Sequence, residues 1–146
     1  MRTTKLGQLT VSAQGLGCMG MSEWYGPADS PLGRGFLTAT VDLGTLDARD
    51  FRSRNPRFAG EAGQANLAIV DAVRSVADAK GVARAQVALA WVYAQQERLG
   101  VPLVPIPGTK RVKWLEQNVA ALDVTLTAHE LAILDPLARQ VTGARY

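Results

Sequence analysis

The sequence contains few of the side chains that bind metals or form disulfides. It has one cysteine, Cys18, and one histidine, His129. A single cysteine excludes a disulfide within the chain and leaves no zinc-ligand spacing, so we expect no metal site and a reducing, cytoplasmic setting. No apolar run is long enough to span a bilayer and no secretory leader is visible, so we expect no membrane association.

Basic residues slightly outnumber acidic ones, and an excess of positive charge can indicate a nucleic-acid partner. The chain has 16 Lys and Arg against 13 Asp and Glu, a net charge of +3. The densest cationic cluster lies in residues 47–58, where arginines alternate with Asp47, Asp50 and two phenylalanines. The interleaved acids, and the lack of any nucleic-acid reading motif, favour a solvated loop. We therefore expect no nucleic acid as a partner.

The remaining composition is that of a globular protein. The chain has 146 residues, 47% of them hydrophobic and 20% charged. A domain of this size buries roughly two-thirds of its unfolded surface. We expect a single domain over residues 1–146 with three parts: a hairpin and first strand in 1–29, an irregular loop region in 30–63, and helices with a last strand in 64–146.

The first two parts carry mainly turn signals. Leu6 and Leu9–Val11 flank Gly7–Gln8, which predicts a small β-hairpin. Ala13–Cys18 is predicted to be a short buried strand. Residues 30–63 are rich in Gly, Asp, Arg and Asn and show no sustained period, and such long loops inside compact domains are usually functional or disordered.

The third part is strongly patterned toward helices. Apolar residues recur at helical spacing over Ile69–Ala77, with a stop at Lys80–Gly81. A second helix is predicted from about Ala83 to Arg98, apolar on more than half its circumference and ended by Gly100. Ala83 stands where a Ser or Thr cap is expected, which costs roughly 0.5–2 kcal/mol.

A strand and two further helices follow. Val101–Ile106 reads as a short strand that its prolines restrict to an edge, and Val112–Leu122 reads as a helix. Thr127 and Glu130 predict a capping box before a last helix that continues through Leu137. The order of helices, strand, loop and helices is similar to the last turn of an α/β barrel.

Two loops combine turn residues with cations. They are SPLGRG at Ser30–Gly35 and IPGTKR at Ile106–Arg111. Turn glycines let backbone N–H groups approach an anion closely, and Arg or Lys supplies the countercharge. Each loop alone also fits an ordinary surface turn. Together they indicate a ligand with separated negative groups, such as a phosphorylated dinucleotide.

Several longer sequence motifs resemble those of one known protein family. The runs KLGxLxVSxxGLGCMGMSxxYGPAD, SPLGRGFLT, DFRxxxPRF, ALAWVxAQ, VPIPGTKRxKxLEQNxAALxVxLT and GARY resemble the aldo-keto reductases. They cover almost the whole chain. The resemblance implies a (β/α)8 barrel that binds NADPH at the carboxyl ends of its strands and reduces a carbonyl compound with hydride from the nicotinamide.

The resemblance also implies which residues contact the cofactor. Lys110 and Arg111 give the 2′-phosphate its countercharge, which favours NADPH over NADH. Gln117 stands where the family commonly has Glu. Cys18 also fits a small buried hydrophobe. The expected contacts are Ser30, Leu32, Gly33, Arg34 and Gly35 at the pyrophosphate, Gly108, Thr109, Lys110 and Arg111 at the ribose and 2′-phosphate, Gln117 and Asn118 at adenine, and Cys18 and Met19 at the nicotinamide.

A large part of the family pattern is missing. YGPAD runs directly into SPLGRG at Asp29–Ser30, where the family has strands two to seven with its catalytic Asp, Tyr, Lys and His. A full barrel needs roughly 250 residues. We therefore expect an α/β fold that is an incomplete (β/α)8 barrel, retaining the hairpin, the first strand and the C-terminal strand–helix units.

No residue is expected to replace the missing catalytic set. Tyr25 sits in a Tyr-Gly pair, but Gly20 occupies the position where the family has Asp, and no Lys or His nearby lowers the tyrosine pKa from about 10. His129 is expected to face solvent in the first turn of the last helix. We expect no catalytic residue.

Three functional hypotheses remain at this point. The first is an NADPH-binding reductase relative that is inactive alone; the others are a non-catalytic interaction module and a decayed fragment. The apolar stripes on Ile69–Ala77 and Val87–Ala94 must pack on each other, recruit a partner (a full-length barrel or a second copy of the chain), or leave the chain prone to aggregation.

Overall fold

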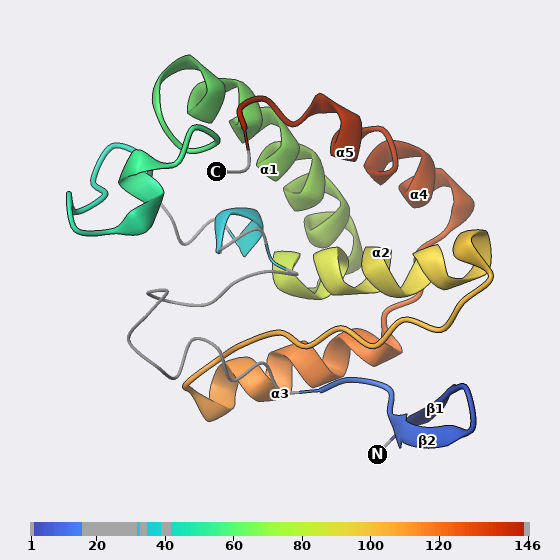
Figure 1. Cartoon of the computed structure of the whole chain (residues 1–146). Helices are drawn as coiled ribbons and strands as arrows, with labels where there is room; N and C mark the ends of the chain where they lie inside the picture. The colour runs from blue at the N-terminus through green and yellow to red at the C-terminus, as the bar shows by residue number, and fades with distance from the viewer. Residues whose placement is uncertain (1, 16–31, 33–34, 39–41, 145–146) are drawn as a thin grey trace.

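The N-terminal hairpin forms as the sequence predicts. The structure, a computed structural model, describes residues 2–15, 32, 35–38 and 42–144. Strands β1 (Thr3–Leu6) and β2 (Leu9–Ser12) pair antiparallel in the register Thr4 to Val11, around Gly7 at φ 61° (Figure 1). A two-stranded hairpin is marginal by itself. Here the Arg2 guanidinium anchors it, donating to the Leu122 carbonyl at 2.5 Å and to the Asp123 carboxylate at 2.7 Å.

The two barrel-like strands are not formed in the described residues. Val101–Ile106 is not a strand, so that prediction is wrong. Of the predicted strand Ala13–Cys18, residues 13–15 are not in a strand and residues 16–18 lie outside the described part. In Val101–Ile106, Pro102 and Pro105 have no N–H to donate to a ladder, and the described residues offer this segment no neighbouring strand. The two segments still meet, because the Gly15 N–H donates to the Pro105 carbonyl at 3.1 Å. A Cβ at Gly15 would lie 2.8 Å from Ile106 Cγ2, so a larger residue there would require the Ile106 side chain to shift.

The region expected to be irregular contains short helical turns. Helix α1 begins at Gly60, before the expected boundary at residue 64. Two single-turn 3₁₀ helices precede it, η2 (Phe36–Thr38) and η3 (Phe51–Arg54). Asp50 starts η3, because its carboxylate accepts the Arg52 N–H at 2.9 Å. Such turns depend on single side-chain contacts and leave no periodic pattern for sequence reasoning to detect.

The two long helices match their predicted ends closely. Helix α1 (Gly60–Lys80) ends at Gly81 with φ 67°, and α2 (Arg84–Leu99) ends at Gly100 with φ 65°. Both glycines adopt the left-handed conformation that terminates helices. Ala83 offers α2 no side-chain acceptor, as predicted. The Gln86 side chain partly compensates, because its Oε1 accepts the Ala83 N–H at 2.8 Å.

The C-terminal helices are shorter than the sequence suggests. The predicted capping box is confirmed: Thr127 Oγ1 accepts the Glu130 N–H at 3.3 Å, and Glu130 Oε2 accepts the Thr127 N–H at 2.7 Å. The last helix does not continue through Leu137, because Pro136 interrupts it. The elements are α3 (Val112–Ala120), η4 (Ala121–Asp123), α4 (Ala128–Leu134) and α5 (Leu137–Gln140).

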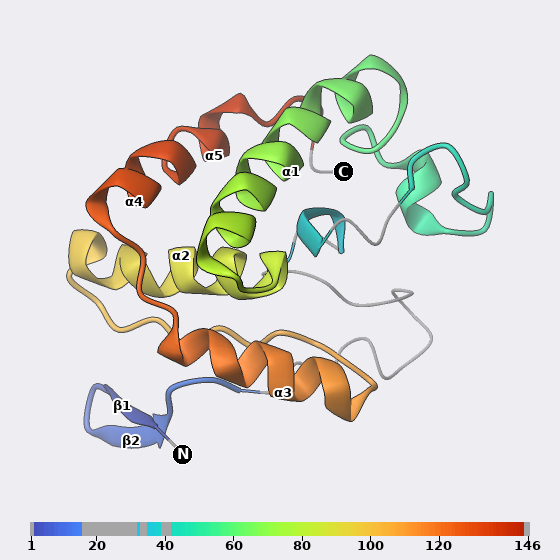
Figure 2. The ribbon, with the colours of Figure 1, turned by 180° about the vertical axis from the view of Figure 1, so that it is seen from behind.

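The apolar stripes of the two long helices pack on each other. Val73, Val76 and Ala77 of α1 form one buried cluster with Val87 of α2 and Leu134 of α4. Figures 1 and 2 show α1 running up from α2, with α4 and α5 beside α1 and with α3 and the hairpin below α2. These residues of the two stripes therefore pack on each other, which is the first of the three expected arrangements.

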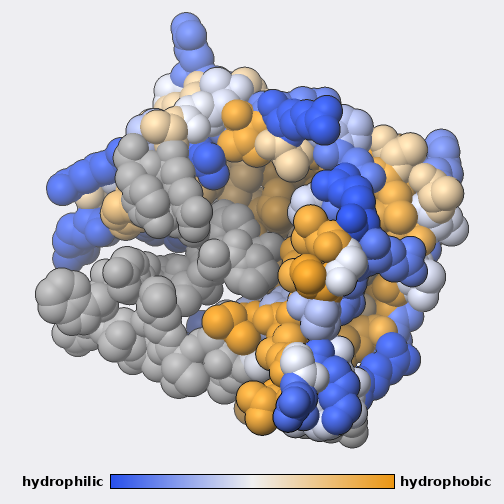
Figure 3. All heavy atoms as spheres, turned by 45° about the vertical axis from the view of Figure 1, so that its right-hand side comes forward, coloured by the Kyte–Doolittle hydropathy of each residue, from blue (hydrophilic) through white to orange (hydrophobic). Residues whose placement is uncertain are grey.

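Apolar side chains at the surface come mainly from helix ends and loops. Figure 3 shows them as separate groups between hydrophilic side chains. The most exposed are Val112 at 70%, Leu9 at 69% and Ile106 at 60%. None of the large exposed ones belongs to the α1 stripe. In the described residues no helix combines the length and the apolar character needed to cross a membrane.

The contacts of Glu130 predict that the stability of the fold depends on pH in the acid range. Its carboxylate accepts the Thr127 N–H and pairs with Lys80 at 3.0 Å, and these contacts lower its pKa. A carboxyl group with a depressed pKa stabilises the fold above its unfolded value, about 4.3, and loses that contribution as the pH falls through the folded value. Glu130→Gln keeps an acceptor for Thr127, and we expect it to flatten the loss of stability below about pH 5. Urea midpoints at pH 7, 5 and 3 test this; parallel losses in both proteins would contradict it.

Candidate functional site

A tight turn brings Lys110 and Arg111 to the start of α3. The turn occupies Gly108–Arg111, between residues 101–107 and helix α3. Thr109 Oγ1 accepts the Arg111 N–H at 3.2 Å. The Arg111 carbonyl in turn accepts the N–H groups of Trp114 and Leu115, each at 3.1 Å. These hydrogen bonds place the two adjacent cationic residues, Lys110 and Arg111, at the N-terminus of α3.

The electrostatics of this entrance favour an anion. The first turn of α3 contains no acidic residue, and Lys110, Arg111 and Lys113 are exposed. Neither Lys110 nor Arg111 forms an ion pair with any residue that the structure describes. Lys113 instead lies 4.9 Å from the centre of the Trp114 ring. The positive end of the helix dipole adds to these charges, so a phosphate group is well matched here.

The two predicted adenine contacts differ in accessibility. Gln117 and Asn118 lie further along α3. Gln117 is half-buried, whereas Asn118 is only 2% exposed. A ligand at this helix therefore reaches the Gln117 side chain more easily than that of Asn118.

Only part of the predicted pyrophosphate loop lies in the described residues. Ser30, Gly33 and Arg34 lie outside them, as do Cys18 and Met19. Gly35 has φ 80°, a conformation that favours glycine. Its carbonyl accepts the Thr38 hydroxyl at 2.6 Å, and the Leu32 carbonyl accepts the Leu37 N–H at 3.3 Å. The end of the loop is thus folded onto η2.

The loop before α1 packs an aromatic side chain, that of Phe58, against η2. The Phe36 and Phe58 rings lie 5.4 Å apart, tilted by 55°, and both side chains are buried. The Phe58 backbone lies close against α1 at Gly63. A Cβ at Gly63 would lie 2.6 Å from the Phe58 carbonyl oxygen, so the absence of a side chain there permits the contact. Sequence reasoning identified Phe58 only as part of a motif run and missed this contact, which no local pattern signals.

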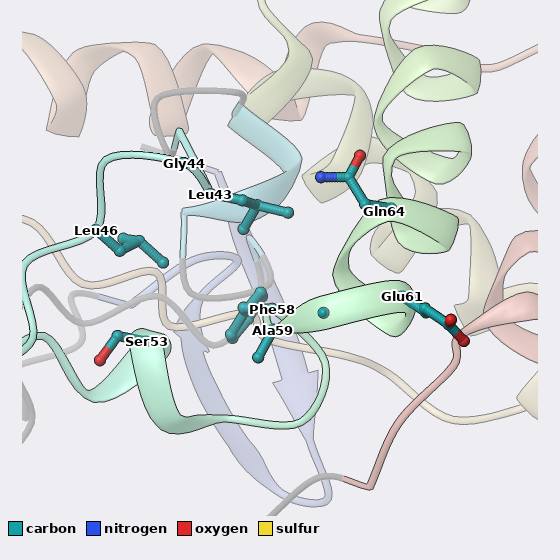
Figure 4. A pocket seen from close by; sticks show the side chains of 9 residues that line it. Leu43, Gly44, Leu46, Ser53, Phe58, Ala59, Glu61 and Gln64 are labelled. Carbon is teal, nitrogen blue, oxygen red and sulfur yellow. The ribbon is translucent and has the colours of Figure 1, made fainter.

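A pocket lies beside Phe58 of this aromatic pair. It has a volume of about 740 Å³. Figure 4 shows the Leu43 and Phe58 side chains at the pocket and the Glu61 carboxylate turned away from the Phe58 ring. Of the predicted cofactor residues that the structure describes, none lines it. The lining residues are Leu43, Gly44, Leu46, Ser53, Phe58, Ala59, Gly60, Glu61 and Gln64.

The described residues offer no tyrosine suited to proton donation. The Tyr93 hydroxyl donates to Gln14 Oε1 at 2.6 Å, and burial raises the Tyr93 pKa to about 12. A general acid needs a pKa near the working pH, so this shift has the wrong sign. His129 is exposed in the first turn of α4, as predicted. Tyr25 lies outside the described residues, and within them no cluster of His, Cys, Asp and Glu has the arrangement of a metal site.

Comparison with known proteins agrees with the sequence motifs. The sequence model of the aldo/keto reductase family matches residues 27–139. The chain is 42% identical over 121 residues to aldo-keto reductase yakc (NADP(+)) of Schizosaccharomyces pombe, covering 80% of this chain and 34% of that protein. It is 36% identical over 114 residues to aldo-keto reductase str7 of Strobilurus tenacellus, covering 77% and 33%. The chain thus spans about a third of the length of these relatives.

Proposed function

The chain belongs to the aldo/keto reductase family, and on this premise we propose that it binds NADPH but does not reduce carbonyl compounds by itself. When bound, NADPH supplies the hydride through its nicotinamide. The described residues proposed to hold it are Leu32, Gly35, Gly108, Thr109, Lys110, Arg111, Gln117 and Asn118. Ser30, Gly33, Arg34, Cys18 and Met19 complete the proposed set.

The observation that carries this proposal is the turn before α3. Lys110 and Arg111 lie side by side at a helix N-terminus whose first turn has no carboxylate. A phosphate monoester carries more negative charge than a diester and accepts several charge-assisted hydrogen bonds. This turn therefore suits the 2′-phosphate that distinguishes NADPH from NADH. The name of the Schizosaccharomyces pombe relative, which includes NADP(+), is in line with this choice.

The proposed lack of turnover follows from proton chemistry. Carbonyl reduction needs a proton donor held within hydrogen-bond distance of the carbonyl oxygen, beside the hydride donor. The resemblance implies that the family's catalytic Asp, Tyr, Lys and His belong to a stretch that this sequence lacks between Asp29 and Ser30. Tyr93 does not substitute for them, because its hydroxyl is engaged by Gln14 and its pKa is raised.

A titration with NADPH tests the binding step. We expect calorimetry on the purified protein to show saturable binding at one site, weaker for NADH than for NADPH. The absence of saturable binding to folded protein would refute the proposal. A parallel assay with NADPH and an aldehyde tests the second claim, and steady oxidation of NADPH, with contaminating reductases excluded, would refute it.

Self-association stays a prediction with its own test. The exposed side chains of Val101, Ile106 and Val112 offer apolar surface near the turn. Sedimentation at several protein concentrations separates a self-associating module from an NADPH-binding monomer. A concentration-independent monomer that binds NADPH would exclude the interaction module as the main role.

A further inference from the structure

A buried asparagine of α1 joins two distant backbone segments. Asn66 is 3% exposed. Its Nδ2 donates to the carbonyls of Arg57 and Thr142, and its Oδ1 accepts the Thr142 N–H, each at 2.9 Å. The amide orientation is determined by its partners, because two carbonyls face the nitrogen and one N–H faces the oxygen. Thr142 lies 76 residues from Asn66 in the sequence.

The C-terminal segment lies directly on the loop that contains Arg57. Gly143 has φ 92°, and a Cβ there would lie 2.7 Å from the Pro56 carbonyl oxygen. Arg57 Nε donates to the Gly143 carbonyl at 3.2 Å. Backbone thus contacts backbone over Pro56–Arg57, which only a glycine at position 143 allows without displacement.

This contact is connected to the pyrophosphate loop by packing. Phe58 follows Arg57 directly, and its ring packs on that of Phe36 at 5.4 Å. Phe36 in turn follows Gly35, the last residue of the loop. Phe36 and Phe58 share their buried cluster with Val70, one turn beyond Asn66 on α1. Closely packed side chains transmit displacements, so the position of residues 56–58 bears on that of residues 35–38.

We propose that Thr142–Gly143 is a strap that holds residues 35–38, at the end of the predicted pyrophosphate loop, in the position that cofactor binding requires, with Asn66 as the positioning residue. The inference rests on the proposed function. It assigns a role at the cofactor site to residues outside the predicted cofactor contacts. The strap acts on the pyrophosphate side of the site, while Lys110 and Arg111 act on the 2′-phosphate side.

One backbone substitution tests the strap. Thr142→Pro removes the N–H that Asn66 Oδ1 accepts, whereas the matched Thr142→Ala keeps both backbone groups. We expect Thr142→Pro to weaken NADPH binding by about fivefold to tenfold, comparable to the loss of one good hydrogen bond. Binding of adenosine 2′-monophosphate, which needs only the Lys110 side, should stay within about twofold. Thr142→Ala should bind both ligands like the parent.

The outcomes separate the strap from the proposed function. Equal NADPH affinities in the folded Pro and Ala variants would overturn the strap, and so would an equal weakening of both ligands. If Thr142→Pro does not fold, Gly143→Ala replaces it with the same expectations. If the parent binds neither ligand, the proposed function fails, and hydrogen exchange at the Leu37 and Thr38 amides decides: faster exchange than in the Ala control supports the strap, and unchanged exchange overturns it.

Discussion

Replacing both cations of the turn, in Lys110→Ser/Arg111→Ser, is expected to weaken NADPH binding by about 100-fold or more. Each side chain is proposed to make a charge-assisted hydrogen bond to the 2′-phosphate, worth about 1.5–3 kcal/mol. Losing both removes at least about 3 kcal/mol, and about 1.4 kcal/mol corresponds to tenfold in affinity. Calorimetric titration with NADPH measures the change.

The chain offers a matched control for this variant. Lys113 is exposed in the first turn of α3, just after the two cations, but its ammonium lies over the Trp114 ring. Lys113→Ser should therefore reduce NADPH affinity by less than about tenfold, as expected for a single surface charge. NADH lacks the 2′-phosphate, so its affinity should be nearly the same in the double variant as in the parent. An equal loss for NADH and NADPH would show that these cations do not recognise the 2′-phosphate.

The largest expected effect on stability comes from Leu89→Ala. The Leu89 side chain on α2 is completely buried, at 0% exposure. Truncating such a side chain removes its burial energy and leaves a cavity, a loss of about 2–5 kcal/mol. Domains of this size are commonly stable by about 5–15 kcal/mol. We therefore expect a much lower urea midpoint in chemical denaturation followed by circular dichroism.

Leu99→Ala supplies the comparison on the same helix. Leu99 is 57% exposed at the last position of α2, so its truncation should change the free energy of unfolding by less than about 0.5 kcal/mol. Similar destabilisation by both substitutions would contradict the burial of Leu89 described above. A midpoint for Leu89→Ala close to that of the parent would do the same.

The features that the sequence predicted well are local ones. Gly81 and Gly100 end their helices because a left-handed residue terminates a helix wherever it occurs. The Thr127–Glu130 capping box spans four consecutive residues and needs no distant partner. The turn at Lys110–Arg111 is likewise set by neighbouring groups, and its cations lie at the helix entrance that the motif implies.

The features that the sequence missed depend on distant partners. Val101–Ile106 has strand-like residues, but a strand also needs neighbouring backbone to pair with, and in the described residues Gly15 supplies a single hydrogen bond. The Asn66 contact joins residues 76 positions apart and carries no periodic or motif signal. The pocket beside Phe58 arises from how an unpatterned loop folds back on α1. Of the candidate site, Cys18, Met19 and most of the pyrophosphate loop lie outside the described residues, so their roles stay predictions.

The Arg2 anchor sets an order of events during synthesis of the chain. Its two acceptors, Leu122 and Asp123, are made about 120 residues later. A ribosome adding roughly 5–20 residues per second needs several seconds or more to reach them. Throughout that time the hairpin has no docking site. Although it is synthesised long before its acceptors, the hairpin therefore reaches its final place only after Leu122 and Asp123 have been added.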